Sequence, residues 1–296
     1  MCRIYEAMKL LSFKEIWRHE LMKSIIALAL AGVLLIPSCA PLSADEDFTY
    51  DYGVFLGASS DDIEYMKQYK TVVIDAQYYS EEEIEELKAG GNTVYSYINL
   101  GSIEDFRPYY KEYVQYSLGS YEHWDQERWM DVSEETWQDF LTGELAPSIL
   151  KKGVDGLFVD NVDVYYNFET EEIYNGVTAI LEGFYALDTY VVINGGDTYV
   201  WEYAERNETL DGILDAVNQE SVFSGIDWDN EDQFTVADEE DHEYFTEYVE
   251  MVSDYGKDVY LLEYTTDEEL IEQIDEYCRK NGFRYYISSS LLLNAG

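Results

Sequence analysis

Short apolar runs that change to a polar residue at one end recur along the chain after residue 50. They predict eight strands, at 50–56, 71–75, 94–99, 156–161, 190–194, 212–218, 257–263 and 283–288. Segments with helical spacing of apolar residues lie between most of them, at 59–69, 80–89, 133–152, 171–187, 238–255 and 267–281. This alternation predicts an α/β protein, a single (β/α)8 TIM barrel over residues 50–296, with an open doubly wound sheet as the alternative.

The segment KKGVDGLFVDNVDVY, residues 151–165, is the strongest local pattern. An apolar core runs directly into Asp160, Asn161 and Asp163. An inner strand of an α/β barrel has this pattern when it brings a carboxylate to the C-terminal rim, where active sites of the fold collect. An edge strand that ends in a solvated acidic turn is the plainer interpretation.

Other predicted strands also switch from apolar to acid or amide at their ends. The strand ends are Asp75, Asn99, Asp160, Asn194, Glu220 and Glu263. Interior barrel positions prefer Val, Ile and Leu, so six such ends predict a polar active site at one rim.

Two long connections are expected to cover this rim. Residues 100–132 form one, with many aromatic side chains that include Trp124 and Trp129, and residues 222–237 form the other, with Asp227, Trp228 and Asp229. Connections of this length inside a compact domain are usually functional. Aromatic faces suit stacking on sugars, and packing within the loop is the plainer alternative.

The first 38 residues have the pattern of a lipoprotein-type signal segment. Lys23 precedes a short apolar run that ends before Cys39. Met22 reads as the natural start of translation, so we expect residues 1–21 to be an over-extension of the coding sequence. The run is short for a transmembrane anchor, the alternative. We therefore expect export, lipidation of Cys39, an acidic tether over 39–49, and attachment to the outer face of the bacterial cell membrane.

The charge is strongly negative, with 18 basic and 62 acidic residues and a net charge of −44. Nucleic acid is disfavoured as a partner because it is itself a polyanion, whereas a polycation would be attracted. Solubility alone is an equally good reason for the acids. Cys278 is the one cysteine after Cys39, so no disulfide framework is expected. His123 and His242 are isolated in the sequence, and we predict neither metal nor cofactor.

Paired rim carboxylates indicate cleavage of a glycosidic bond. One carboxyl group must donate a proton to the leaving oxygen, while the other, ionised, attacks the sugar or activates water. The sequence contains neither the G-x-S-x-G of a serine hydrolase nor a G-x-G-x-x-G after the first strand.

Six segments in this order resemble glycoside hydrolase family 114, the endo-α-1,4-polygalactosaminidase group. They are VYSYINLGSIEDFRPYY, WMDV, KKGVDGLFVDNVDVY, VVINGG, ILDAVNQESVF and KDVYLLEYT, within residues 50–290. The resemblance implies a (β/α)8 barrel and retaining hydrolysis of a partly deacetylated galactosamine polymer, with Asp160 as nucleophile and Glu220 as acid/base. It also implies sugar contacts from Asp75, Tyr97, Asn161, Asp163, Asn194 and Glu263.

Asn99 and Trp124 complete the expected substrate contacts, from the strand ends and the aromatic connection respectively. If hydrolysis proceeds with retention, the carboxyl groups of Asp160 and Glu220 should lie about 5–5.5 Å apart. A glycosidase for another glycan and a non-catalytic carbohydrate-binding lipoprotein remain as alternatives.

Overall fold

The computed structural model describes residues 48–121, 124–227 and 234–295. The expected signal segment, Cys39, most of the tether, Trp228 and Asp229 lie outside these residues. Within them, no helix is both long and apolar enough to cross a bilayer.

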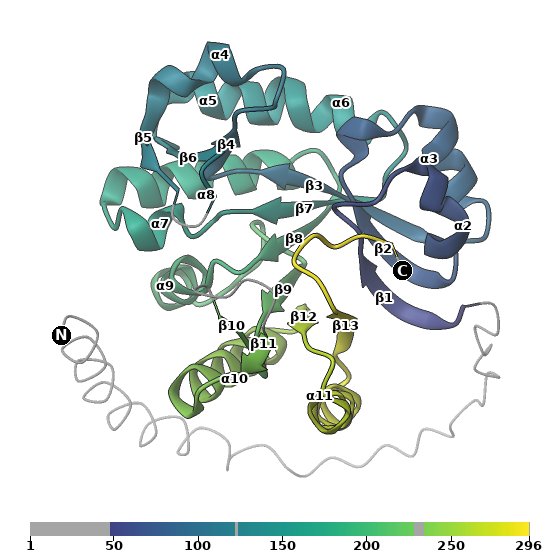
Figure 1. Cartoon of the computed structure of the whole chain (residues 1–296). Coiled ribbons are helices and arrows are strands. Elements are labelled where there is room, and N and C mark those ends of the chain that lie inside the picture. Colours follow the sequence, from purple (N-terminus) through teal and green to yellow (C-terminus); the bar gives the residue numbers. More distant parts are fainter. Residues whose placement is uncertain (1–47, 122–123, 228–233, 296) are drawn as a thin grey trace, which may run out of the picture. The chain divides into compact units, whose positions relative to one another are not determined.

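Eight parallel strands form the barrel that the sequence predicts (Figure 1). They are β1 (Tyr50–Val54), β2 (Tyr69–Ile74), β3 (Thr93–Asn99), β7 (Gly156–Asp160), β8 (Tyr190–Asn194), β9 (Ala216–Glu220), β12 (Asp258–Tyr264) and β13 (Arg284–Ser288). They pair in chain order, and the outermost two, β1 and β13, contact each other. This sequential order nearly closes the sheet into a (β/α)8 barrel and excludes the open doubly wound alternative, whose strand order reverses.

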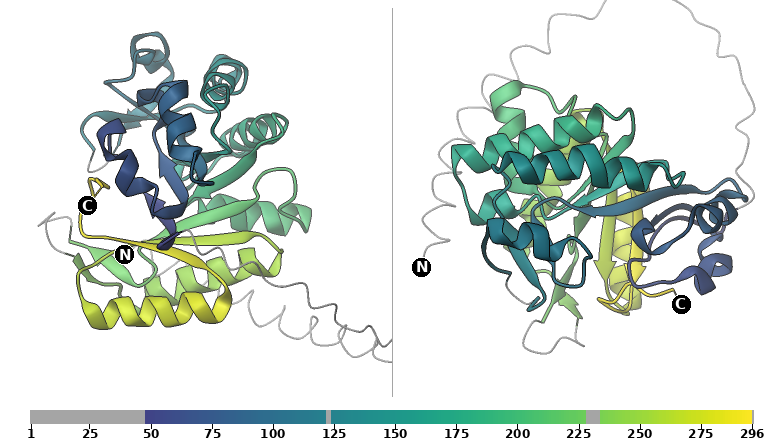
Figure 2. Two further views of the ribbon diagram at one scale, coloured as in Figure 1. Left: turned by 90° about the vertical axis from the view of Figure 1, so that its right-hand side faces the viewer. Right: turned by 90° about the horizontal axis from the view of Figure 1, so that it is seen from above.

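Helices cover the outside of the strands (Figure 2). The larger ones are α3 (Glu81–Lys88), α5 (Glu135–Phe140), α6 (Ala146–Leu150), α8 (Glu171–Tyr185), α9 (Asp197–Asn207), α10 (Glu239–Asp254) and α11 (Glu268–Asn281). In α3, a capping box between Ser80 and Glu83 fixes the start, and Ile84 and Leu87 point into the core. Amphipathic segments thus become helices because one face packs against the sheet.

Tyrosine fills much of the barrel interior. The inward-facing side chains form their own buried cluster, and Tyr52, Tyr95, Tyr97, Tyr260 and Tyr264 belong to it. A second, larger cluster lies between strands and helices. Part of the high tyrosine content therefore serves the core rather than sugar contact.

Three sequence expectations need correction. The strand expected at 212–218 is β9 at Ala216–Glu220, because Gly212 adopts a φ of 89° in a turn that precedes it. No helix is predicted between the strands at 190–194 and 212–218, but α9 lies there, and Gly196 caps its start in the left-handed conformation. The helix expected at 133–152 contains Pro147, and a π-helical turn at Leu141–Leu145 precedes this proline.

The two expected rim connections both carry extra strands. Between β3 and β7, β4 (Ser102–Glu104), β5 (Ser117–Ser120) and β6 (Glu127–Met130) form a small antiparallel sheet. After β9, β10 (Ser224–Ile226) pairs with β11 (Phe234–Val236). Helix α4 (Tyr110–Tyr113) also belongs to the first connection. These additions build walls above the C-terminal ends of the barrel strands.

Candidate active site

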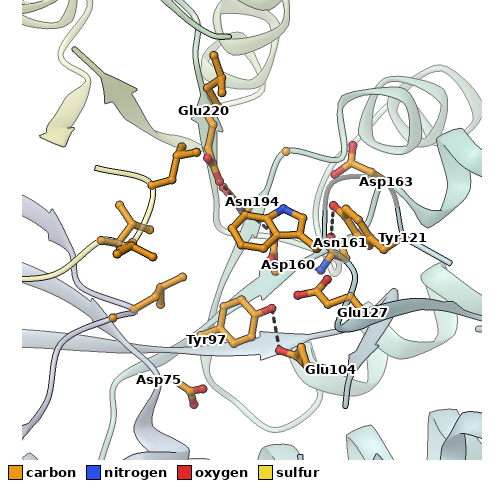
Figure 3. Close-up of a pocket in the computed structure, with 18 of the residues that line it drawn as sticks. Asp75, Tyr97, Glu104, Tyr121, Glu127, Asp160, Asn161, Asp163, Asn194 and Glu220 are labelled. Atoms are coloured by element: carbon orange, nitrogen blue, oxygen red, sulfur yellow. Dashed lines mark hydrogen bonds between the residues drawn. The ribbon is translucent and has the colours of Figure 1, made fainter. Parts of the chain in front are cut away.

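A cavity of about 810 Å³ opens at the C-terminal rim (Figure 3). Among the described residues, its lining contains seven carboxylates and a single guanidinium: Asp75, Glu104, Glu127, Asp160, Asp163, Asp197 and Glu220, with Arg107. Barrel strands, the β3–β7 connection and the C-terminal segment all contribute to it. The cavity thus lies where the strand-end pattern predicts it.

The centre of the cavity is a carboxylate pair bridged by an amide. The Nδ2 group of Asn194 donates to Asp160 Oδ1 over 2.9 Å and to Glu220 Oε1 over 2.8 Å (Figure 3). Because both bonds share one nitrogen, the two oxygens lie at most about 5.7 Å apart, the sum of the two distances. Two carboxylates are thereby held together across one short gap.

A chain of hydrogen bonds fixes the orientation of this amide. Tyr52 donates its hydroxyl to Asn218 Oδ1 over 2.9 Å, and Asn218 Nδ2 donates to Asn194 Oδ1 over 2.7 Å. Since the carbonyl oxygen of Asn194 accepts the hydrogen bond from Asn218, its NH₂ group must face the two carboxylates. Tyr52 and Asn218 do not line the cavity and act through Asn194.

The two carboxylates have different surroundings. Burial, opposed by the Asn194 hydrogen bond and reinforced by the charge of Glu220, raises the pKa of Asp160 to about 6. Glu220 also accepts from the Tyr264 hydroxyl over 2.7 Å. A hydroxyl can donate to a carboxylate and accept from a carboxylic acid, so Tyr264 can form a hydrogen bond with Glu220 whether Glu220 is ionised or protonated.

The residue that follows each carboxylate has a left-handed backbone. Asn161 has a φ of 62° and Ser221 a φ of 56°, a region that costs energy for residues other than glycine. Tyr121 donates to Asn161 Oδ1 over 3.0 Å and helps to hold that turn. Gly101 is required beside it, because a Cβ there would lie 1.8 Å from the Asn161 carbonyl oxygen.

A buried ion-pair cluster, Asp75–Arg107–Glu104, forms one wall. Arg107 binds Asp75 over 2.6 Å and Glu104 over 2.7 Å. Glu104 also accepts from the Tyr97 hydroxyl over 3.3 Å, and its second oxygen is buried without a partner among the described residues. Burial and the charges of Glu104 and Asp160 raise the pKa of nearby Glu127 to about 8.

A second acidic pair, Asp163 and Asp197, also lines the cavity. Burial is the main reason that the pKa of Asp163 rises to about 8, and the charge of Asp197 adds to it. Asp163 accepts from the Gly196 backbone N–H over 3.2 Å, and Asp197 accepts from the Tyr244 hydroxyl over 2.6 Å. Asp163 therefore also caps the start of α9.

Most of the sequence-predicted site residues line this one cavity. They are Asp75, Tyr97, Trp124, Asp160, Asn161, Asp163, Asn194 and Glu220. Glu104, Arg107 and Glu127 also line it, although the sequence did not single them out as site residues. Asp227 follows β10 and lies next to the undescribed residues 228–233.

Two predicted contacts must be corrected, because neither side chain lines the cavity. Glu263 lies between Leu262 and Tyr264, which both face the barrel interior, so the strand alternation turns it outward. Its carboxylate is fully buried and accepts hydrogen bonds from the backbone N–H groups of residues 222–224. Asn99 is also buried and donates to the Tyr97 hydroxyl and Ser102.

No group of three or more His, Cys, Asp or Glu side chains in the described part of the chain is arranged to hold a metal ion. The carboxyl groups of this rim can supply protons and negative charge.

Paired carboxyl groups at the C-terminal rim of a TIM barrel are the arrangement that glycoside hydrolases use. The model of glycoside-hydrolase family GH114 matches residues 38–182, and the chain belongs to this family. The family expected from the sequence is thus confirmed.

Three proteins of known sequence or structure are similar to this chain. The uncharacterized protein MJ1477 of Methanocaldococcus jannaschii is 22% identical over 237 residues, which cover 72% of this chain and 65% of that protein. The glycoside hydrolase domain of PelA from Pseudomonas aeruginosa superposes with a TM-score of 0.69 at 18% identity, covering 82% of this chain and 96% of that domain. Ega3 of Aspergillus fumigatus, in complex with galactosamine, gives 0.66 at 15% identity, with 89% and 98% covered. At these identities, the two structures support the barrel fold.

Proposed function

We propose that this protein hydrolyses a galactosamine-containing polysaccharide with retention of configuration. The observation that carries the mechanism is the Asn194 bridge, which keeps one oxygen of Asp160 within about 5.7 Å of one oxygen of Glu220. Carboxyl groups about 5–5.5 Å apart favour a double displacement, whereas inversion needs about 6.5–9.5 Å to admit a water molecule.

Asp160 is the nucleophile in this proposal and Glu220 the acid/base. Glu220 protonates the glycosidic oxygen while Asp160 attacks the anomeric carbon, which forms a glycosyl–enzyme ester and releases the leaving chain. Glu220 then takes a proton from water, the water attacks the same carbon, and Asp160 leaves as a carboxylate. With a pKa of about 6, Asp160 is mostly ionised at neutral pH, as a nucleophile must be.

The charge of the cavity supports a cationic substrate. Seven carboxylates face one guanidinium in its lining, so a polymer with free amines would be attracted to it. Ega3, a structural neighbour, was crystallised with galactosamine. If this attraction matters, added salt should lower kcat/KM steeply; a flat response would leave solubility as the reason for the acids.

We further propose that the protein is exported and held at the cell membrane through a lipid on Cys39. The apolar run before Cys39 supports this. A Cys39→Ala substitution should release the protein from the membrane fraction, and unchanged membrane attachment would contradict lipidation.

The test of the function is product release from a panel of polymers. The panel contains acetylated and deacetylated galactosaminogalactan, chitosan and a neutral glucan, and each is incubated with the unchanged protein, Asp160→Asn, Glu220→Gln and Glu64→Gln. Glu64 is a control because its side chain is 81% exposed. Cleavage of the aminogalactan alone, lost in the first two variants only, supports the proposal, and NMR of the first product gives the anomer.

Other outcomes separate the parts of this proposal. Cleavage of a different glycan, still lost in Asp160→Asn and Glu220→Gln, keeps the mechanism and rejects the substrate. Binding without cleavage would favour a carbohydrate-binding lipoprotein. An inverted product would reject Asp160 as nucleophile.

A further inference from the structure

A second cavity, of about 480 Å³, adjoins the active site. Three residues line both cavities: Tyr78, Phe106 and Arg107. Beyond them the second cavity extends toward the α5–α6 region, where Phe140, Leu145, Ser148 and Ile149 line it. Tyr78 and Phe106 therefore form a ridge over which an extended ligand could pass from one cavity to the other.

The two ridge side chains are unusually exposed for large apolar groups. Tyr78 is 65% exposed and Phe106 is 54% exposed. Both rings nevertheless have a fixed support, because the Arg107 guanidinium lies 5.7 Å from the Tyr78 ring centre and 5.2 Å from that of Phe106. Exposed rings that are held in place offer contact area at low entropic cost.

The backbone beneath Tyr78 is also held on two sides. Asp75 accepts from the Gln77 N–H at the start of this turn over 3.1 Å and binds Arg107. On the side of the second cavity, Lys152 Nζ donates to the carbonyl oxygens of Ala76 and Tyr79, over 2.7 Å each. The ion pair to Asp75 thus ties the turn that carries Tyr78 to the segment that carries Phe106.

The second cavity differs in charge from the first. Its lining contains one carboxylate, Glu144, together with two cationic side chains, Arg107 and Lys152. The remaining lining is mostly aromatic and aliphatic. These features fit an uncharged pyranose, whose C–H face packs on the rings, and not a free amine.

We propose that the second cavity is a distal subsite for an uncharged sugar unit, a hexose or an N-acetylhexosamine, of the same polysaccharide that is cleaved at Asp160. This inference rests on the proposed function and sharpens its substrate class: a polymer in which amine-bearing units occupy the acidic cavity while a neutral unit lies beyond the ridge of Tyr78 and Phe106. A fully deacetylated homopolymer of galactosamine has an amine on every unit, lacks that neutral unit and should be the poorer substrate.

The test compares polymer with short substrate in ridge variants. Tyr78→Ala and Phe106→Ala should each lower, by about tenfold, the ratio of kcat/KM on partly acetylated galactosaminogalactan to kcat/KM on a short galactosamine oligosaccharide, as expected when roughly one stacking contact is lost. Tyr78→Phe should restore the ratio, because it keeps the ring. Tyr166→Ala is the matched control, since Tyr166 is 58% exposed and lines neither cavity.

The outcomes separate this inference from the function on which it rests. An unchanged ratio in both alanine variants, or an equal preference for a fully deacetylated homopolymer of galactosamine, would overturn the distal subsite while the hydrolase stands. A ratio that falls as much in Tyr166→Ala would overturn it too. Absence of cleavage by the unchanged protein on every galactosamine polymer would overturn both proposals together.

Discussion

Replacement of Arg107 by Gln should destabilise the fold strongly, although Arg107 lies at a ligand cavity. The side chain is 4% exposed and neutralises two carboxylates that are equally buried, Asp75 and Glu104. Removal of one partner from a buried ionic cluster leaves uncompensated charge, which costs about 3–5 kcal/mol. We therefore expect the free energy of unfolding of Arg107→Gln to fall by about that amount at pH 8.

The chain offers a matched control in Arg206. This residue also binds two carboxylates, Glu171 over 3.0 Å and Glu202, but its side chain is 36% exposed. Water screens such a pair, so Arg206→Gln should cost about 0–1 kcal/mol. Because each variant breaks two ion pairs, the difference between them reports burial rather than the number of contacts.

The deficit of Arg107→Gln should depend on pH. Burial already raises the pKa of Asp75, and Arg107 opposes that rise; without Arg107 the pKa of Asp75 must go higher. A folded-state pKa above the unfolded value gives stability that is present at low pH and is lost as pH rises through the folded pKa. The deficit should therefore be smaller at pH 5 than at pH 8.

Equilibrium unfolding in urea at both pH values measures this effect. Addition of Asp75→Asn and Glu104→Gln to Arg107→Gln should recover much of the loss at pH 8, because no unpaired carboxylate remains. A deficit that equals that of Arg206→Gln and does not change with pH would refute the reasoning.

Three further predictions concern the carboxylate pair. Tyr52→Phe should lower kcat about tenfold and leave KM nearly unchanged, because one hydrogen bond that orients Asn194 through Asn218 is lost; initial rates that show a change in KM alone would contradict this. Ser221→Gly should raise the free energy of unfolding by about 1 kcal/mol, since glycine accepts the φ of 56° without strain, and an unchanged melting temperature would argue against strain there. Finally, kcat/KM should fall below about pH 6 as Asp160 is protonated. Asn194→Ala should move this fall to higher pH, because the hydrogen bond from Asn194 lowers the pKa of Asp160. A fall that stays at the same pH would mean that another group is being protonated.

Strand alternation explains which rim residues could be predicted from the sequence. Phe158, Val192 and Asn218 face the barrel interior, and Asp160, Asn194 and Glu220 each lie two positions further along the same strand. Residues two positions apart in a strand point to the same face of the sheet, so these side chains point into the cavity. Glu263 fails the same rule, because its neighbours Leu262 and Tyr264 face inward. An apolar run that ends in a polar residue marks the end of a strand, but it does not say to which face of the sheet that last side chain points.

The wall formed by Glu104, Arg107 and Glu127 could not be predicted in the same way. These residues belong to the connection between β3 and β7, where β4 pairs with β6 in antiparallel register. Their positions depend on pairing between segments more than 20 residues apart and on the buried ion pairs to Asp75, neither of which leaves a periodic signal. Length and aromatic content indicated function there, but not which side chains would carry it.

The middle strand of the site sets the distance on which the stereochemistry depends. Asp160 ends β7 and Glu220 ends β9, with β8 paired between them. Two strand spacings would place their backbones about 9.5 Å apart, a separation in the range of inverting enzymes if the side chains stood parallel. Asn194, at the end of β8, donates to both carboxylates and draws the facing oxygens to within about 5.7 Å of each other. Since Asn218 and Tyr52 hold that amide from inside the barrel, this short spacing, on which the proposed retention rests, is set by the core beneath the cavity rather than by the loops around it.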